Sequence, residues 1–330
     1  MNRRNMTTLM IGWEGRLKRI FVLVPRENWI VDRIGAEFCE YSSHDARTVP
    51  FDCDIVWLAA PWCWDQVPVD VLRAKKVVCS LHHEVPEKFV DDRLVKFRMR
   101  DQIVDQYIVP CQQTYELISK HTDKPVTKIG YWWNKKLWSL PESNSVLEYR
   151  SSLGISDDEY VIGSFQRDTE GSDLVTPKLE KGPDILCDYL EMLDRTCEKR
   201  LHVLLGGWRR QYVINRLKEA EIYYTYREMP ELDELNMMYS ACDLYASTSR
   251  YEGGPQCLFE APAAGTHIVS SNAGMASDCL IEHCIVGDFG KEDGYRDFED
   301  SHLAENKEKI SKFEISEHIR NYDNFFGGIL

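Results

Sequence analysis

Short runs of apolar residues recur along the chain at the spacing of strands that alternate with helices. In the first half these runs are 19–25, 55–60, 76–81, 106–110 and, more weakly, 126–129. In the second half they are 160–163, 202–205, 222–225, 243–247 and 267–270. Continuous apolar strands between helical segments are typical of parallel sheets with crossover helices. The pattern therefore predicts an α/β protein with two sheets of about five strands each.

A polar stretch over residues 134–156 separates the two sets of runs. Within it, Pro141-Glu-Ser-Asn-Ser145 indicates a turn or linker rather than a helix or strand. We place the domain boundary here, with one domain over residues 1–140 and a second over 141–315. Beyond them, apolar residues at helical spacing behind Ser316 predict a terminal helix.

The length and net charge of the chain limit the number of domains and the classes of ligand that can be expected. A chain of 330 residues with 43% hydrophobic side chains buries a large core, which favours two domains. Its 40 basic and 54 acidic residues give a net charge of -14, so no general attraction to nucleic acid or anionic lipid is expected. A polyanionic ligand must therefore be held by a local pocket.

The cysteines and the apolar segments indicate in which cellular compartment the protein is expected. Eleven cysteines form no CxxC pair and mostly lie in apolar segments, as reduced core thiols do. The first ten residues lack the apolar core of a signal peptide, and no apolar run is long enough to span a membrane. We expect a cytoplasmic protein without a transmembrane segment; peripheral attachment to a membrane and the oligomeric state stay open.

The candidate chemistry follows the predicted strand 243–247. Thr248-Ser-Arg-Tyr-Glu-Gly-Gly-Pro255 reads as a loop that feeds a short helix, because Pro255 suits a first helical position and Gly265 a position just past a helix end. A helix start offers free backbone N–H groups, and Gly253 and Gly254 let a ligand approach them. The segment is thus suited to an anion.

Two carboxylates, Glu252 and Glu260, bracket this turn. A carboxylate can accept two hydrogen bonds from a sugar diol. Taken alone, however, the pair is more simply interpreted as an ordinary loop carboxylate at Glu252 and a charge on the helix surface at Glu260.

The frame Glu252-Gly253, Glu260-Ala261 and Gly265 resembles glycosyltransferase family 4, whose retaining enzymes have the GT-B fold and two glutamates separated by seven residues. The preceding Met238-Tyr-Ser-Ala-Cys-Asp-Leu-Tyr-Ala-Ser247 is similar to the family's segment before this motif. Pro262 departs from the pattern and should bend or shorten the helix. The resemblance implies two Rossmann-like domains that face each other across a cleft, with 316–330 crossing back to the first.

The same resemblance implies a basic clamp for the donor diphosphate. The segment 161–167, with Gly163 and Arg167, and the segment 178–184, with Lys181, are similar to the family's Gly-Arg…Lys-Gly pair. Positive charge there would stabilise the leaving diphosphate. Ordinary surface charge is the alternative, more so for Lys178 than for Lys181, and residues 168–177 look inserted between the two halves of the clamp.

Two further sites follow from the resemblance. Arg227 and Met229 occupy the place where the family receives the nucleobase, although a simple turn is the alternative. After the strand 76–81, His83 would line the reacting centre, with a structural histidine or a metal ligand as alternatives, whereas His82 is expected to face away. The family's glycine-rich loop after the first strand is missing, and Arg26, Asn28 and Trp29 stand in that place.

Other residues carry weaker hypotheses. Asp52-Cys-Asp54 matches the Asp-x-Asp metal motif of the other glycosyltransferase fold, but it precedes a strand instead of following one. The tryptophans of Pro61-Trp-Cys-Trp64 could stack on sugars, with packing between domains as the alternative. No metal site is expected, because Arg167, Lys181 and the amides near Gly253 would stabilise the leaving group.

Together these features predict a glycosyltransferase that moves a hexosyl or pentosyl group from a nucleoside diphosphate sugar to an acceptor hydroxyl with retention and without a metal. No cofactor is expected beside the nucleotide sugar as co-substrate. The acceptor is a glycan, a lipid-linked sugar or a small molecule. A GT-B epimerase or phosphorylase and a non-catalytic nucleotide-sugar-binding module are the alternatives.

Overall fold

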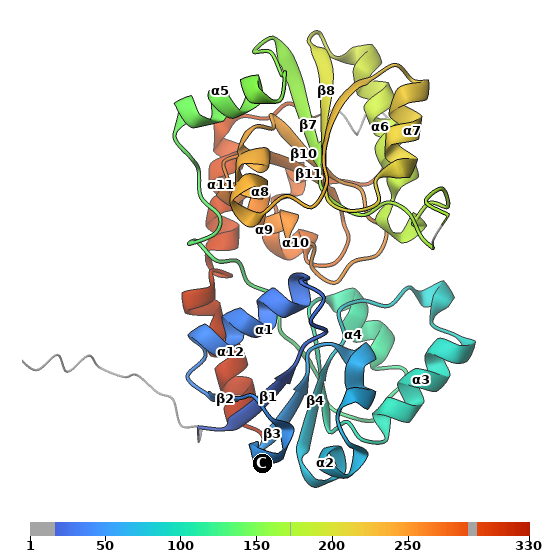
Figure 1. Cartoon of the computed structure of the whole chain (residues 1–330), viewed down its shortest axis with the longest axis vertical. Helices are drawn as coiled ribbons and strands as arrows, with labels where there is room; N and C mark the ends of the chain where they lie inside the picture. The colour runs from blue at the N-terminus through green and yellow to red at the C-terminus, as the bar shows by residue number, and fades with distance from the viewer. Residues whose placement is uncertain (1–16, 172, 290–295) are drawn as a thin grey trace, which may run out of the picture.

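The computed structural model of the chain describes residues 17–171, 173–289 and 296–330. It contains two six-stranded sheets, one in each half of the chain, stacked end to end (Figure 1). Within the described residues no helix is both long and apolar enough to cross a bilayer. The first ten residues, on which the expectation about a signal peptide rests, lie outside the described residues.

The first sheet is entirely parallel, with the strand order β2-β1-β3-β4-β5-β6. Its strands are β1 (Arg19–Leu23), β2 (Asp45–Arg47), β3 (Ile55–Leu58), β4 (Lys76–Ser80), β5 (Gln106–Val109) and β6 (Val126–Lys128). Its helices are α1 (Ile30–Tyr41), α2 (Val69–Ala74), α3 (Asp91–Asp101) and α4 (Gln112–Ile118), with the 3₁₀ turns η1 (Pro50–Asp52), η2 (Pro61–Gln66) and η3 (Pro86–Lys88).

The second sheet is also parallel, with the order β12-β11-β10-β7-β8-β9. Its strands are β7 (Glu159–Ser164), β8 (Arg200–Gly206), β9 (Tyr223–Arg227), β10 (Leu244–Ser247), β11 (His267–Ser271) and β12 (Ile285–Val286). Its helices are α5 (Ser143–Ser152), α6 (Pro183–Thr196), α7 (Gln211–Glu219), α8 (Leu232–Ser240), α9 (Cys257–Ala263), α10 (Ala276–Cys279) and α11 (Asp300–Ser311), with η4 (Leu179–Lys181) and η5 (Glu282–Cys284).

The C-terminal helix α12 (Ile315–Gly327) belongs to the first half of the molecule in space. The ring of its buried Phe326 lies 5.3 Å from that of Trp57 on β3 and 5.4 Å from that of Phe38 on α1. Figure 1 shows this helix running down beside the first sheet, so the chain crosses between the halves twice.

All ten predicted strands are present, but the sequence pattern missed two. β2 has the sequence Asp-Ala-Arg with no buried residue, and β12 is two residues long, so neither forms an apolar run. The interpretation of 141–145 as a turn was also wrong, because α5 starts at Ser143. None of its residues is buried, which is why no helical periodicity of apolar residues marks it.

The predicted helix after Pro255 starts two residues later than expected, at Cys257, and its seven residues include Pro262. Gly265, with φ +92°, follows its end as expected. All eleven cysteines lie in the described residues and have free thiols.

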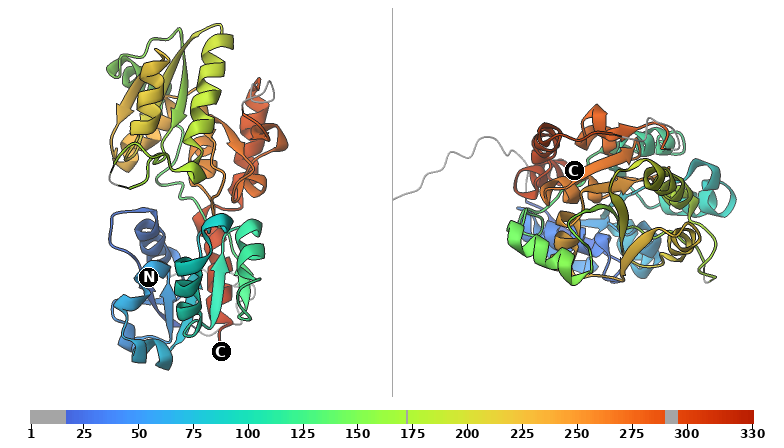
Figure 2. Two further views of the ribbon diagram at one scale, coloured as in Figure 1. Left: turned by 90° about the vertical axis from the view of Figure 1, so that its right-hand side faces the viewer. Right: turned by 90° about the horizontal axis from the view of Figure 1, so that it is seen from above.

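The loops at the carboxyl ends of the two sheets meet. A Cβ built on Gly253, after β10, would lie 2.0 Å from the carbonyl oxygen of His82, after β4. The carboxyl ends of parallel strands are where open α/β sheets bind ligands. This meeting of the two edges positions the site described next (Figure 2).

Candidate active site

The loop after β10 is anchored to the start of α6 by backbone geometry. Gly182 has φ +61°, and a Cβ there would lie 2.0 Å from the carbonyl oxygen of Thr248, so this position requires glycine. The Thr248 hydroxyl donates to the Gly182 carbonyl oxygen at 2.9 Å. Two residues further along each segment, Arg250 pairs with Asp184 at 2.6 Å. These contacts hold η4, which carries Lys181, against the loop that carries Glu252.

Glu252 is a buried, ionised carboxylate. Lys181 Nζ lies 2.5 Å from Glu252 Oε1, and the Ser249 hydroxyl lies 3.1 Å from the same oxygen. Burial alone would raise the pKa of Glu252, but the charge of Lys181 and the hydrogen bonds from Lys181 and Ser249 hold the pKa below its ordinary value. A permanent negative charge thus sits where the two edges meet.

His83 is the neutral counterpart of this ion pair. Burial, followed by the positive charge of Lys181, lowers the pKa of His83 to about 4, although Glu252 acts in the opposite direction. At neutral pH the imidazole therefore carries one donor and one acceptor nitrogen. Its neighbour His82 contacts the Ala59 carbonyl oxygen at 2.7 Å and the Tyr131 hydroxyl at 2.5 Å, so both of its nitrogens are used in packing.

A cavity of about 280 Å³ opens between the two edges. Residues from the loop after β4, from α4 and from the loop after β10 line it: His83, Glu84, Pro86, Gln113, Thr114, Glu116, Leu117, Lys120, Tyr251 and Glu252. Two predicted residues, His83 and Glu252, thus face one space.

Three cations gather beside this cavity. Burial and the charge of Lys181 lower the pKa of Lys178, with Arg167 adding to the effect. Burial, followed by Arg209, lowers the pKa of Arg167. Groups that repel one another in this way are stabilised by a bound anion. The structure therefore brings Arg167 to the same place as Lys181, despite the residues inserted between them.

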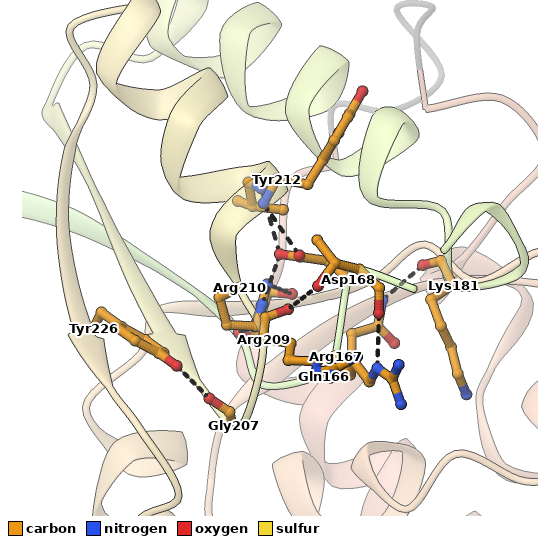
Figure 3. A network of polar contacts seen from close by, with 12 residues as sticks. Gln166, Arg167, Asp168, Lys181, Gly207, Arg209, Arg210, Tyr212 and Tyr226 are labelled. Atoms are coloured by element: carbon orange, nitrogen blue, oxygen red, sulfur yellow. Dashed lines mark hydrogen bonds and ion pairs between the residues drawn. The ribbon is translucent and has the colours of Figure 1, made fainter. Parts of the chain in front are cut away.

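The inserted segment is fixed by a pair of residues that the sequence analysis missed. Arg210 is fully buried, and its Nε lies 3.1 Å from Asp168 Oδ2 (Figure 3). Arg210 also donates to the carbonyl oxygens of Ser164 and Gly206, the latter at 2.9 Å. Asp168 in turn accepts bonds from backbone amides at the start of α7. An Arg in Trp208-Arg-Arg210 after a predicted strand was the available signal, but its partner lies 42 residues away.

Gly253 and Gly254 are packed between the two halves. A Cβ on Gly254 would lie 2.7 Å from the ring of Tyr131 and 2.8 Å from Met275 Sδ. Within the described part of the chain, the backbone amides of Gly253 and Gly254 have no hydrogen-bond partner. Both glycines are buried, so these amides are suited to a ligand oxygen.

Glu260 lies at the same interface between the two halves, and both of its carboxylate oxygens accept hydrogen bonds from other side chains. Arg33 Nη2, on α1, lies 2.9 Å from Glu260 Oε1 and also 2.9 Å from Gln256 Oε1. The Tyr239 hydroxyl donates to Glu260 Oε2 at 2.9 Å. The side chain is 6% exposed. Each oxygen keeps a second lone pair, so a diol could add to this arrangement only by sharing or displacing these donors.

The remaining predicted residues do not line the cavity. A Cβ on Gly163 would lie 2.6 Å from Cys242 Sγ, so this glycine serves close packing inside the sheet. Arg227 pairs with Glu234 at 2.7 Å, and Met229 is exposed with φ +49°. Arg227 is the last residue of β9, and Met229 follows that strand.

No cluster of three or more metal-ligating side chains occurs in residues 17–171, 173–289 and 296–330. Asp52 and Asp54 both pair with Arg19, at 2.6 and 2.7 Å, at the amino end of β3. The hydrogen bond from Arg19 lowers the pKa of Asp54 to about 2. These two ion pairs with Arg19 give both carboxylates of the Asp-x-Asp motif a structural role.

A family model described as glycosyl transferases group 1 matches residues 176–312, the segment that contains Lys181, Glu252 and Glu260. No protein with a curated description matches the chain significantly.

Solved structures share the whole architecture. HepE from Anabaena, in complex with UDP and glucose, is 14% identical with a TM-score of 0.74, over 95% of this chain and 100% of that one. A glycosyltransferase from Rickettsia africae is 11% identical with a TM-score of 0.64, over 95% and 98% of the two chains. Sucrose-phosphate synthase from Thermosynechococcus elongatus is 16% identical with a TM-score of 0.62, over 92% and 79%. The chain has the GT-B fold that the sequence predicted.

Proposed function

We propose that this protein is a glycosyltransferase that moves a hexosyl or pentosyl group from a nucleoside diphosphate sugar to an acceptor hydroxyl. One observation carries the proposal: the ionised Glu252, paired with Lys181 at 2.5 Å, and the neutral His83 line a single cavity where the carboxyl edges of two Rossmann-like sheets meet. The family match over residues 176–312 supports it. UDP-glucose is the first donor to test, because the similar HepE structure was solved with that compound.

The cations supply the electrostatic part of the reaction. In the transfer, the bond between the anomeric carbon and the diphosphate oxygen breaks, and the diphosphate gains negative charge. Lys181 has three N–H donors, so it can keep its bond to Glu252 while it binds the diphosphate. Arg167 and Lys178 add charge from the same side. We propose that these groups stabilise the leaving group without a metal ion, and that no further cofactor takes part.

The sugar would lie between Glu252 and His83. The amides of Gly253 and Gly254 and the Glu252 carboxylate can bond donor hydroxyls, and His83 can bond the reacting sugar through either nitrogen. The acceptor oxygen forms its bond to the anomeric carbon on the face that the diphosphate leaves, and its proton passes to the diphosphate. This course retains the anomeric configuration. Glu260 would hold the ribose by exchanging a bond with Arg33.

The test is a transfer assay with UDP-, GDP-, ADP- and dTDP-sugars and a panel of glycan, lipid-linked and small-molecule acceptors. The expected outcome is release of nucleoside diphosphate with a new glycoside, whose anomeric proton coupling in NMR shows the donor's configuration. The rate should be the same in excess EDTA.

Three outcomes would contradict this proposal. Epimerised or phosphorolysed sugar without transfer would identify another kind of GT-B enzyme. Saturable nucleotide-sugar binding without turnover would identify a binding module. An inverted product, or full loss of rate in EDTA, would overturn the proposed course of the reaction.

A further inference from the structure

Two exposed tryptophans stand beside each other at the carboxyl edge of the first sheet. Trp29 follows β1 and is 54% exposed, and Trp62 lies in η2 after β3 and is 46% exposed. Their ring centroids are 6.5 Å apart. Apolar side chains that are exposed next to each other are more typical of a binding surface than those exposed singly. This edge is the one that faces the proposed donor site.

The loop that presents Trp29 is held in a strained shape. Arg26 and Asn28 have φ of 60° and 55°, which non-glycine residues adopt rarely. The Asp32 carboxylate accepts bonds from the backbone amides of Arg26, Glu27 and Trp29, at 2.7, 2.9 and 3.0 Å. Strain that the surrounding structure maintains in this way is concentrated at ligand sites.

The second tryptophan connects this loop to the cavity. The ring of Trp62 lies 6.0 Å from that of His82, whose carbonyl oxygen touches Gly253 and whose neighbour is His83. The tryptophan pair is therefore separated from the proposed reacting centre by a single layer of residues.

Carboxylates flank the pair. Burial, followed by the charges of Glu27 and Asp65, raises the pKa of the Cys63 thiol, which places both carboxylates close to the residue beside Trp62. Indole faces pack against the C–H face of a pyranose ring, and carboxylates accept bonds from its hydroxyls. Negative charge at this place disfavours a phosphorylated acceptor or an anionic membrane.

On the basis of the proposed function, we propose that Trp29 and Trp62 form the acceptor subsite and that the acceptor is an uncharged glycan. The indoles stack on its sugar rings and direct its terminal hydroxyl toward His83. This assigns the acceptor class, which the proposed function leaves open.

Calorimetric titration of the full chain with maltotetraose, cellotetraose and chitotetraose tests this subsite. Wild type should bind at least one of them, and Trp29→Ala and Trp62→Ala should each weaken that binding by about tenfold or more. Phe51→Ala is the matched control, because Phe51 is an exposed aromatic of the same sheet, 66% exposed, at the amino end of β3. It should bind like wild type.

Parallel titrations with UDP, GDP and ADP separate the two proposals. If the nucleoside diphosphate that binds wild type also binds both tryptophan variants equally, the variants are folded and their donor side is intact. The acceptor subsite is overturned if nucleotide binds but no tetrasaccharide does, if the tryptophan variants bind the sugar like wild type, or if only phosphatidylglycerol-containing vesicles bind. If wild type binds no nucleoside diphosphate, the proposed function fails instead.

Discussion

The carboxyl edge of the second sheet presents an ion pair shielded from solvent, whereas the carboxyl edge of the first presents two partly exposed indoles and a neutral imidazole. The second sheet presents Lys181 and Glu252, joined at 2.5 Å. The first presents Trp29, Trp62 and the neutral His83. The two sheets share strand number and parallel pairing, so their scaffolds do not explain the difference. The loops alone set the chemistry of each edge.

This contrast suits two substrates of different charge. The carboxyl edge of the second sheet, here called the ionic edge, holds a buried ion pair, and buried charges need partners in fixed positions. This edge therefore favours a charged ligand of defined geometry. The carboxyl edge of the first sheet, here called the aromatic edge, presents exposed indoles, on which stacking depends on shape and apolar surface. This edge therefore favours an uncharged ring. Changes on one edge should therefore affect one substrate and spare the other.

The largest expected effect comes from Glu252→Gln, which keeps the shape and removes the charge. The turnover number should fall about a thousandfold, because the carboxylate that orients Lys181 and the donor sugar is lost. Affinity for the nucleoside diphosphate should be unchanged or tighter, because Lys181 is freed to bind phosphate. Steady-state kinetics and calorimetry measure the two quantities.

Glu170→Gln is the control for this change, since Glu170 is a carboxylate of the same half that pairs with Lys88. It should keep full turnover. A Glu252→Gln protein with wild-type turnover would show that the ionic edge does not take part in the reaction.

The second effect tests the order in which the sequence placed two lysines, with Lys181 ahead of Lys178. Lys181→Met should lower kcat/KM for the donor about a hundredfold, since Lys181 reaches the cavity through Glu252. Lys178 contacts Glu180 at 3.8 Å, so Lys178→Met should cost about tenfold or less. Equal losses of kcat/KM in the two variants would show that the two lysines contribute only their positive charge, without a specific contact of Lys181 to the donor.

The sequence predicted the ionic edge better than the aromatic edge, for a physical reason. Glu252, the glycines and the following helix form one local frame, in which turn and helix-end preferences of neighbouring residues are visible. The same holds for ten of the twelve strands in the described residues, since buried parallel strands are apolar runs.

Contacts between segments that are far apart in the sequence produce no local pattern of residues that could have predicted them. Arg33 meets Glu260 across 227 residues of sequence, and Asp168 meets Arg210 across 42. The exposure of Trp29 and Trp62 likewise depends on how two loops lie next to each other. The prediction of Arg227 and Met229 as the base-binding pair rests on position alone, and neither residue lines the cavity that holds His83 and Glu252.

The third prediction concerns the contact that joins the two edges. Arg33→Met should lower the free energy of unfolding by about 2 kcal/mol, because the Glu260 carboxylate, 6% exposed, loses its charged partner. The double variant Arg33→Met with Glu260→Gln should recover part of the loss, because no buried charge is left alone. Thermal and urea unfolding measure both.

Donor affinity extends this test to function. If Glu260 exchanges Arg33 for ribose, the single Arg33 variant should bind nucleotide at least as well as wild type, and the double variant should bind it less well. A loss of affinity in the single variant alone would show that Arg33 holds the donor site in shape instead.

The smallest effect is expected at His83, where the two edges meet. His83→Gln keeps a donor and an acceptor, so turnover at pH 7 should fall only about tenfold, the value of one imperfect hydrogen bond. The ratio of wild-type to variant rate should stay constant from pH 8 to pH 5, since the wild-type ring, with its pKa of about 4, is neutral throughout. A ratio that changes near pH 6.5 would mean that the ring is charged in the working enzyme.

Stability gives an independent measure of the same ring. The pKa of His83 lies below its ordinary value of 6.5, so above pH 6.5 both folded and unfolded states are neutral and its contribution to stability is complete. As the pH falls from 6.5 to 4, the unfolded chain takes up a proton that the folded protein resists, and this contribution is lost. The melting temperature of wild type should therefore fall more steeply over that range than that of His83→Gln. Parallel curves would mean that the ring is solvated, and that the neutral character of the first edge does not extend into the cavity.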